Sequence, residues 1–359
     1  MAKFGLLVTS PVSKYKNIGD YMQSLAAKQF IGDKYCLVEK ESISKFEDEE
    51  EVKVIMNAWY MWHPENWPPQ PCITPLLTSM HITPLKAEGM LSEKGKEYLI
   101  KNGPVGCRDL ATKEILEKAG VPAYFSACLT LTLGHSYMYD GERKGVIFVD
   151  PYLPPYKYIV DGKTILYPFN IIKSFWYYLK NRKKVNRLLK VTNYFYSKYK
   201  FLVYYKASMF YEAYSSMFAD DVIFSAKYYT HMVSVSDDDN NATLLAKAEN
   251  LLRRYSKAEL VVTSRIHCAL PSTSVKTPVI FILNKDMESD KNMFGSPGRF
   301  GGLIDFFRVM VYDRDKLQSR DEGISKHEKI HKNTRIKPKV NWQRYADEMI
   351  KKCMDFVKS

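Results

Sequence analysis

Short apolar runs alternate with longer amphipathic segments along most of the chain. The strand-like runs are rich in Val, Ile, Leu and Phe, and they lie at residues 4–9, 52–56, 105–107, 145–150, 229–234, 259–263 and 278–283. Helical patterns lie between several of them, at residues 20–30, 109–119 and 242–257. This alternation is typical of βαβ units, in which the strands are parallel and helices cover the sheet. The pattern therefore predicts an α/β fold.

The segment 242–257 carries the strongest helical pattern, because its apolar residues share one face: Leu244, Leu245, Ala248, Leu251, Leu252 and Tyr255. Three aspartates at 237–239 precede it. Such a run can bind a metal ion, but an acidic turn before a helix is also favoured by the helix dipole. We interpret the run as an acidic turn, and the sequence predicts no metal site.

The chain has 359 residues, 46% of them apolar, which is enough for two domains of about 150 residues. Residues 135–144 are polar and rich in tyrosine, so we predict a boundary there. The first lobe then covers residues 1–140 and the second covers 141–335. The polar tail at 336–359 ends in a predicted closing helix.

An insertion at 151–220 interrupts the second lobe and differs from the rest of the chain in composition. Residues 162–211 contain no Asp or Glu, and eleven Lys and Arg residues alternate there with aromatic residues. One interpretation is a pair of amphipathic helices that pack on the second lobe and expose their lysines. The other is a peripheral contact with a membrane, because basic and aromatic side chains favour an anionic bilayer surface.

The formal net charge of +13 favours an anionic partner, which can be nucleic acid, a membrane surface or a phosphorylated substrate. The six cysteines form no CxxC pair, so neither a zinc cluster nor a disulfide framework is predicted. Scattered thiols are typical of a reducing cytoplasm, and we expect a cytoplasmic protein. No Walker A, GxGxxG, HExxH or GxSxG motif occurs.

Three junctions between a strand and a helix carry candidate chemistry, because ligands of open parallel sheets bind beyond the carboxyl ends of the strands. The first is Asn17-Ile-Gly-Asp20. Asp20 can cap the following helix, with Gln23 three residues later, or it can contact a substrate. The second is Val105-Gly-Cys-Arg-Asp109, in which Asp109 is placed to cap the next helix. Arg108 can form a surface ion pair or hold a carboxylate or phosphate with its planar guanidinium.

The third junction runs from Glu259 to His267, a buried-type strand followed by a helix. We predict Ser264 as the N-cap, with Arg265 and His267 in the first turn. An anion at this helix N-terminus would meet free backbone N–H groups as well as the Arg265 guanidinium. The alternative is a solvent-facing basic turn or a buried structural histidine.

Four sequence blocks together resemble the polysaccharide pyruvyl transferase family: N-I-G-D at 17–20, G-C-R-D at 106–109, S-A-C-L-T-L-T-L at 126–133, and V-V-T-S-R-I-H-C-A-L-P at 261–271 followed by T-P-V-I-F-I at 277–282. The resemblance spans residues 5–307 except the insertion. It implies two Rossmann-like lobes in a glycosyltransferase-B-like (GT-B-like) arrangement, with the acceptor on the first lobe and the donor on the second.

The resemblance also implies a reaction and its residues. Pyruvate would pass from phosphoenolpyruvate to a sugar of a polysaccharide or a lipid-linked glycan precursor as a ketal. The R-x-H block, Arg265, Ile266 and His267, would bind the donor, and Arg108 would reach it from the first lobe. Because ketal formation needs an acid with a pKa near neutrality, we assign the acid to His267. No cofactor is needed besides the donor substrate.

Several assignments stay open. The base or an acceptor contact can be Asn17, Asp20, His81 or His231, and the aromatic segment 57–63 offers Trp59 for stacking on the acceptor sugar. A nucleotide-sugar glycosyltransferase is the alternative enzyme, since the same two-lobed architecture serves both reactions. A lectin-like or nucleic-acid-binding protein, which would use the insertion as its surface, is the alternative without catalysis. We expect no nucleic-acid partner.

Overall fold

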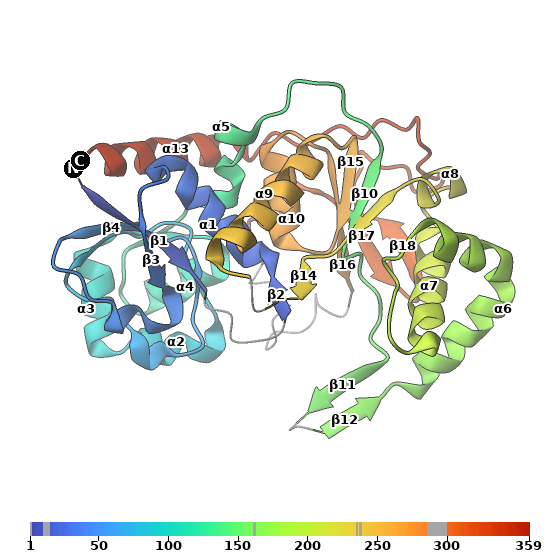
Figure 1. Ribbon diagram of the computed structural model, residues 1–359, viewed down its shortest axis with the longest axis horizontal. Helices are drawn as coiled ribbons and strands as arrows, with labels where there is room; N and C mark the ends of the chain where they lie inside the picture. Colours follow the sequence, from blue (N-terminus) through green and yellow to red (C-terminus); the bar gives the residue numbers. More distant parts are fainter. Residues whose placement is uncertain (1, 10–14, 161–162, 235, 237–238, 286–299) are drawn as a thin grey trace.

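Two mostly parallel sheets with helices on their faces form the core of the computed structural model (Figure 1). It describes residues 2–9, 15–160, 163–234, 236, 239–285 and 300–359. The predicted α/β fold with parallel sheets is confirmed, and the arrangement is consistent with Rossmann-like lobes.

The first sheet has four parallel strands in the order β3-β1-β4-β6. Their bounds are Cys36–Glu39 for β3, Lys3–Val8 for β1, Val52–Ile55 for β4 and Ile73–Leu76 for β6. Strand order reverses between β1 and β4, which makes their carboxyl ends the switch point of this sheet. Its principal helices are α1 (Ile18–Ile31), α3 (Glu93–Lys101) and α4 (Leu110–Lys118).

The second sheet has six strands in the order β13-β10-β15-β16-β17-β18, and only β18 is antiparallel. The bounds are Lys227–Tyr229, Val146–Val149, Leu260–Thr263, Val279–Asn284, Arg308–Asp313 and Lys316–Ser319 in that order. Helices α9 (Asn241–Ser256) and α10 (Ile266–Ser274) follow the predicted pattern. The switch point lies between β10 and β15, since the chain passes from β10 to β13 on one side and to β15 on the other.

The strand predicted at 229–234 is wrong in one respect, because it divides into two. β13 ends at Tyr229, and β14 (Met232–Ser234) leaves the sheet to pair with β2 (Tyr15–Asn17). The turn between them is fixed where the His231 backbone N–H donates to the Asp150 carboxylate at 2.9 Å. Strand β2, from the part of the chain that forms the first sheet, is thereby paired with β14, from the part that forms the second sheet.

The two sheets share a central core. Helices α1 and α9 pack on each other, and the Tyr21 hydroxyl donates to Asn241 Oδ1 at 2.8 Å. A helix is present at the predicted closing segment, α13 (Gln343–Lys358), and it buries Ala346, Met349 and Cys353 in this core, together with Trp342 just before it. Figure 1 shows it beside α1, with the C-terminus near the N-terminus.

The insertion forms a hairpin and two helices. The hairpin strands are β11 (Lys157–Val160) and β12 (Lys163–Leu166), and the helices are α6 (Pro168–Val191) and α7 (Lys200–Tyr214). Phe210 of α7 stacks edge-on against Phe148 of β10, and Val185 and Leu188 of α6 belong to the same core. The predicted helix pair is therefore present and covers one face of the second sheet (Figure 1).

The shorter elements are 3₁₀ turns, short strands and short helices. Their bounds are Lys40–Lys45, Pro64–Asn66, Pro84–Lys86, Leu129–Thr132 and Ile304–Phe306 for the 3₁₀ turns, Trp59–Tyr60 (β5), His81–Ile82 (β7), Val105–Cys107 (β8) and Ala123–Phe125 (β9) for the strands, and Ala87–Met90 (α2), Gly134–Tyr137 (α5) and Asp220–Ile223 (α8) for the helices.

Candidate functional site

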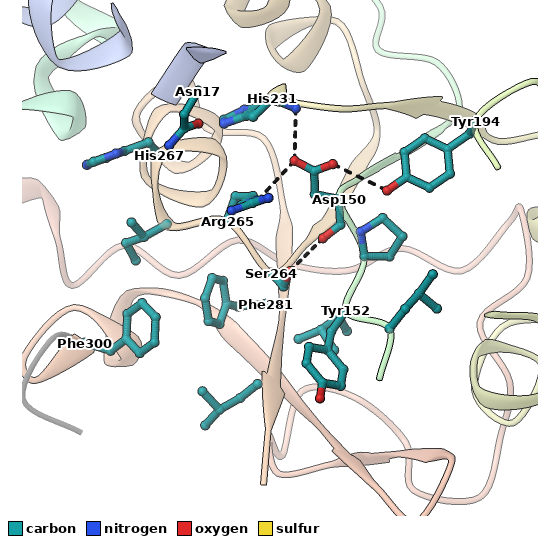
Figure 2. Close-up of a pocket in the computed structure, with 15 residues that line it drawn as sticks. Asn17, Asp150, Tyr152, Tyr194, His231, Ser264, Arg265, His267, Phe281 and Phe300 are labelled. Atoms are coloured by element: carbon teal, nitrogen blue, oxygen red, sulfur yellow. Dashed lines mark hydrogen bonds and ion pairs between the residues drawn. The ribbon is translucent and has the colours of Figure 1, made fainter. Parts of the chain in front are cut away.

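A cavity of about 440 Å³ opens at the switch point of the second sheet (Figure 2). The carboxyl ends of β10 and β15 supply Asp150, Ser264 and Arg265, and residues of β16 supply part of its apolar wall. Asn17 also lines the cavity, and it comes from the end of β2, directly before α1. Open α/β sheets bind ligands at such a point, so this cavity is the candidate active site.

Asp150 organises the polar side of the cavity. It follows β10 with a φ of 39°, a left-handed conformation that aspartate tolerates better than most residues. Its Oδ2 accepts from Arg265 Nε at 3.1 Å and from the His231 backbone N–H at 2.9 Å. Its Oδ1 accepts from the Tyr194 hydroxyl at 3.4 Å. One carboxylate thus connects β15, the turn after β13 and the insertion (Figure 2).

Arg265, and not the predicted Ser264, is the N-cap of α10. Ser264 is unsuited to that role because its hydroxyl donates to the Asp150 carbonyl at 2.6 Å. Within the described part of the chain, no side chain caps this helix. The first backbone N–H groups of α10 and the half-exposed Arg265 guanidinium therefore offer a cationic end beside the cavity.

His231 is buried and is part of the lining of the same cavity. Its Nε2 is 2.8 Å from the Tyr255 hydroxyl. Burial lowers its pKa to about 4, the Asp150 carboxylate opposes that shift, and the Arg265 charge adds to it. His231 is thus a neutral residue near pH 7, and its low basicity makes it a poor base.

The N-I-G-D turn packs directly against the two histidines of the cavity. Asn17 is the N-cap of α1, and its Oδ1 accepts from the Gly19 N–H at 3.0 Å. The predicted cap, Asp20, is wrong because α1 begins at Ile18 and Asp20 already lies in its first turn. A Cβ atom on Gly19 would lie 3.1 Å from His267 Cβ and 3.3 Å from His231 Nδ1. Any side chain at this position would therefore force its neighbours to move by a few tenths of an ångström.

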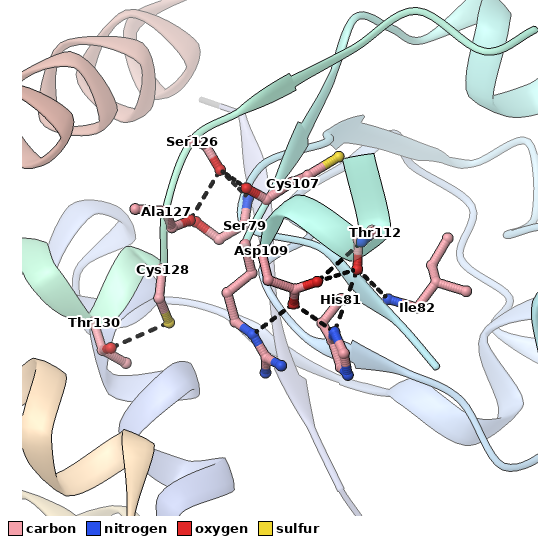
Figure 3. A network of polar contacts seen from close by, with 11 residues as sticks. Ser79, His81, Ile82, Cys107, Asp109, Thr112, Ser126, Ala127, Cys128 and Thr130 are labelled. Carbon is pink, nitrogen blue, oxygen red and sulfur yellow. Dashed lines mark hydrogen bonds and ion pairs between the residues drawn. The ribbon is translucent and has the colours of Figure 1, made fainter. Parts of the chain in front are cut away.

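Arg108 is buried and does not line the cavity that holds Arg265. It lies next to Asp109, whose polar contacts are shown in Figure 3. Its Nε is 3.3 Å from Asp109 Oδ2, and only 1% of the side chain is exposed. The alternative of a surface ion pair is therefore wrong. Two of its nitrogens, Nε and Nη2, have no hydrogen-bond partner among the described residues.

Asp109 caps α4 as predicted, since its Oδ1 accepts from the Thr112 N–H at 3.0 Å. Its Oδ2 is 2.6 Å from His81 Nδ1. Burial alone would raise the pKa of Asp109, but the adjacent His81 and Arg108 hold it below the usual range. His81 is therefore held by the Asp109 carboxylate, apart from the residues that line the cavity.

Asp20 and Trp59 line a second, narrower pocket. It lies at the switch point of the first sheet, where β1 and β4 end, and Asn57 is also part of it. Lys40 Nζ lies 4.6 Å above the Trp59 ring and donates to the Trp59 carbonyl at 2.8 Å. The structure thus brings together Asn17, His231, Arg265, Ile266 and His267 in one cavity and leaves Arg108, His81, Asp20 and Trp59 outside its lining.

Two cavity residues escaped the sequence interpretation. Asp150 was visible as the polar end of a predicted strand, and its place at a strand terminus was a usable signal. The sequence around Tyr194 carried no such signal, because Tyr194 belongs to the insertion and approaches Asp150 only in the folded chain. Burial raises the pKa of Tyr194, and the Asp150 charge raises it further. Its hydroxyl is therefore a donor to that carboxylate.

Neither a metal site nor a membrane span is found within the part of the chain that the structure describes. No group of three His, Cys, Asp or Glu side chains there could hold a metal ion. Asp237 and Asp238 of the aspartate run lie outside the described residues, while Asp239 pairs with Lys247 at 2.6 Å. No described helix is both long and apolar enough to cross a bilayer.

Comparison with known proteins identifies one family. The family model for polysaccharide pyruvyl transferases matches residues 82–286, more than half of the chain. The match includes Arg108, Asp150 and the Arg265 to His267 block, and it excludes Asn17, Asp20 and Trp59. No curated protein matches the sequence.

Proposed function

The chain belongs to the polysaccharide pyruvyl transferase family, a family of transferases, and from this premise we propose that it transfers pyruvate from phosphoenolpyruvate to a sugar as a ketal. The proposed acceptor is a sugar of a polysaccharide or of a lipid-linked glycan precursor. The observation that carries the proposal is the cationic end of α10 at the switch point of the second sheet. Phosphoenolpyruvate bears a phosphate and a carboxylate, and such a helix end binds anions.

Arg265 would bind one anionic group of the donor. The ion pair with Asp150 engages Nε at 3.1 Å and fixes the plane of the guanidinium. Its terminal nitrogens would then bond a phosphate or carboxylate in two-pronged geometry, supported by the N–H groups of Ile266 and His267. A preorganised guanidinium loses little entropy when the donor binds.

Arg108 would contribute from the first lobe. Asp109 lies 3.3 Å from Nε of this buried guanidinium, but Nε and Nη2 have no hydrogen-bond partner among the described residues, which is costly unless a further anion completes the coordination. The donor carboxylate is such an anion. For this role, either the donor must span the space between Arg108 and the cavity, or the cluster around Arg108 must shift when the donor binds. The donor would then contact both lobes, as in a GT-B-like arrangement.

His267 would act as the general acid. Its proton adds to the methylene carbon of phosphoenolpyruvate, and the neighbouring carbon gains oxocarbenium character. One sugar hydroxyl adds to that carbon, and a second hydroxyl then displaces phosphate to close the ketal. Of the two hydroxyl protons, one restores the acid and the other leaves with the phosphate, so the reaction needs no redox cofactor. Arg265 would stabilise the departing phosphate.

The acceptor would enter from the first lobe, where Asp20 and Trp59 line the pocket at the switch point of the first sheet. Trp59 would stack on a sugar ring. Asp20 would be the base, because His81 is tied to Asp109 and His231 has a pKa of about 4. A cytoplasmic location with the acceptor at the inner face of the membrane is part of this proposal.

Binding of phosphoenolpyruvate to single arginine variants tests the donor site. We expect Arg108→Ala and Arg265→Ala each to weaken binding by roughly 1.5 to 3 kcal/mol, the contribution of a hydrogen bond to a charged group. Isothermal titration calorimetry measures this directly. Arg253→Ala is the matched control, because Arg253 pairs with Glu249 on the exposed face of α9. Wild-type affinity in either variant would remove that residue from the site.

A second titration distinguishes pyruvyl transfer from the alternative reaction of a nucleotide-sugar glycosyltransferase. A nucleotide-sugar glycosyltransferase would bind sugar nucleotides and show no affinity for phosphoenolpyruvate. Stabilisation of the protein by phosphoenolpyruvate alone supports pyruvyl transfer, and stabilisation only by a sugar nucleotide contradicts it.

A further inference from the structure

The outer face of α6 exposes a row of large apolar side chains. Phe169 is 68% exposed and Trp176 is 63% exposed, and Ile172, Phe175 and Leu179 are about half exposed. At 3.6 residues per turn these five residues share one face of the helix, opposite the face that buries Ser174, Val185 and Leu188. A helix that packs on a sheet normally exposes polar residues on its outer face, so this row is an unusual surface.

The same face of α6 changes character along its length. Its first half, from Phe169 to Leu179, is apolar, whereas its second half, which follows a kink at Asn181, exposes Lys183, Arg187 and Lys190. Next to the apolar half, the hairpin exposes Ile165 and Leu166 at the end of β12. The apolar surface therefore continues from the helix onto the hairpin that precedes it.

Some basic residues of the insertion are already neutralised within the fold, and others are not. Lys173 pairs with Asp315, Lys180 with Glu212 and Lys184 with Asp220. Among the ion pairs of the described residues, none involves Arg182 or Lys183, which are exposed. No carboxylate occurs from residue 162 to 211, so this surface has no acidic side chain of its own. The uncompensated charge lies beside the apolar row.

We propose that the outer face of α6 and the adjoining hairpin dock the protein onto an anionic lipid bilayer. The apolar row would enter the boundary between headgroups and acyl chains, and the basic half of the helix would lie along the headgroups. A second copy of the chain fits less well, because the two basic halves would repel each other. A nucleic acid fits the charge but gains nothing from contact with exposed Ile and Leu. The proposal rests on the insertion alone and not on pyruvyl transfer.

Docking in this orientation brings the candidate active site near the bilayer. Residues 150–156 lead directly from Asp150 in the cavity to the first strand of the hairpin. Figure 1 shows the hairpin and the start of α6 on the side of the second sheet to which its parallel strands point their carboxyl ends. An acceptor anchored in a lipid would thus meet the protein on the side of its cavity.

Sedimentation of the full-length protein with vesicles tests the proposal. The probes are phosphatidylcholine vesicles with and without phosphatidylglycerol. We expect binding only to the anionic vesicles, weaker as salt rises because exposed charges are screened. The double variant Phe169→Ser/Trp176→Ser should reduce the partition coefficient at least about tenfold, and Arg182→Gln/Lys183→Gln should reduce it about tenfold.

The matched control is Leu85→Ser/Val340→Ser, because Leu85 is 70% exposed and Val340 is 63% exposed, outside the insertion. It should bind vesicles as the wild type does. Circular dichroism of all variants should show an unchanged melting temperature, since each altered side chain is exposed. Failure of the wild type to sediment with anionic vesicles at low salt overturns the proposal. So does unchanged sedimentation of the serine double variant.

Two further outcomes would assign the surface to another partner and overturn the proposal. One is a wild-type dimer in analytical ultracentrifugation that the Phe169→Ser/Trp176→Ser variant converts to a monomer. The other is tight binding of a short oligonucleotide that displaces the protein from the vesicles and persists in that variant. Phosphoenolpyruvate titration of the same variants is independent of either result, so loss of docking and loss of the donor site are distinguishable.

Discussion

At the scale of single residues, Asp150 determines how the cavity is arranged. Its carboxylate accepts from Arg265 Nε, from the His231 backbone and from Tyr194. A buried carboxylate needs several donors, and here each donor comes from a different segment. The position of the Arg265 guanidinium in front of α10 is therefore fixed by residues far from it in sequence.

We predict that His267→Ala reduces turnover by roughly 10²- to 10⁴-fold, the range expected for loss of a general acid. The donor should still bind, because the anion contacts lie on Arg265 and the helix end. Steady-state phosphate release with acceptor measures turnover, and calorimetry measures donor binding. Near-normal turnover in this variant would assign the acid to another residue.

The buried His231 predicts how stability depends on pH. Burial lowers its pKa to about 4, below the usual value of about 6.5, so the unfolded chain binds the proton more tightly. Stability should therefore fall as the pH falls from 6.5 toward 4, by about 2 kcal/mol between pH 7 and pH 5 from this residue. Urea denaturation at both pH values measures the change, and His231→Gln should lack this part of it. An equal change in stability in the wild type and in His231→Gln would show that His231 is not the source of this pH dependence.

At the scale of elements, the beginning of α1 shows how a local motif is used by a distant part of the fold. Asn17 caps the helix, the Ile18 N–H donates to the His231 carbonyl at 2.8 Å, and Gly19 allows close approach of His267. The start of α1 is thus fixed by contacts with His231 and His267, which belong to the part of the chain that forms the second sheet. This contact positions Asn17 in the lining of the cavity.

Gly19→Ala should lower turnover more than it lowers stability. Its new Cβ would lie 3.1 Å from His267 Cβ and from Asn17 Oδ1, so His267 or the turn must shift by a few tenths of an ångström. We expect a decrease of about tenfold or more in kcat, with donor affinity changed less, because misplacement of a catalytic group mainly affects the transition state. The assays are phosphate release and thermal melting. Unchanged kcat would show that the turn does not position the histidine.

At the scale of the whole molecule, one core joins the two sheets and the C-terminal helix. Its buried residues include Leu6 of β1, Leu25 of α1, Val149 of β10, Leu252 of α9 and Met349 of α13. We propose the division into lobes at 1–140 and 141–335, supported by the two separate sheets, with 336–359 as a closing segment. The lobes of this division would be joined by the β2 and β14 pair as well as by the shared core.

Met349→Ala should destabilise the whole chain by about 2 to 5 kcal/mol, the cost of a large cavity in a core. Met349 is buried, and its sulfur is contacted by the Ser79 hydroxyl at 3.2 Å. Because both sheets share this core, we expect one cooperative transition by circular dichroism and by tryptophan fluorescence. Glu348→Ala, on the exposed side of the same helix, is the control and should change stability by less than about 0.5 kcal/mol. Two separate transitions in the variant would contradict the shared core.

The sequence by itself determined the class of fold and several of its strands and helices, because hydrophobic periodicity and strand-to-helix junctions are local properties of the chain. It did not indicate β3, β6, β17 or α3. The parallel strands, α9, the cap Asp109 and the junctions that carry Arg108 and Arg265 were predictable for that reason. Even for these local features, competing hydrogen bonds changed which residues cap two of the helices. Asn17 displaced Asp20 as a cap, and the Ser264 hydroxyl was taken by Asp150.

Only the tertiary structure decided which of these residues meet. Asp150 and Arg265 are 115 positions apart, and their ion pair depends on the neighbouring places of β10 and β15 in the sheet. The same holds for the pairing of β14 with β2, for the approach of Tyr194 and for the face that α6 exposes. Sequence patterns assign a residue to a strand or a helix, whereas strand order and packing bring together side chains from distant segments. The candidate site is a product of that packing, and so is the proposed membrane surface.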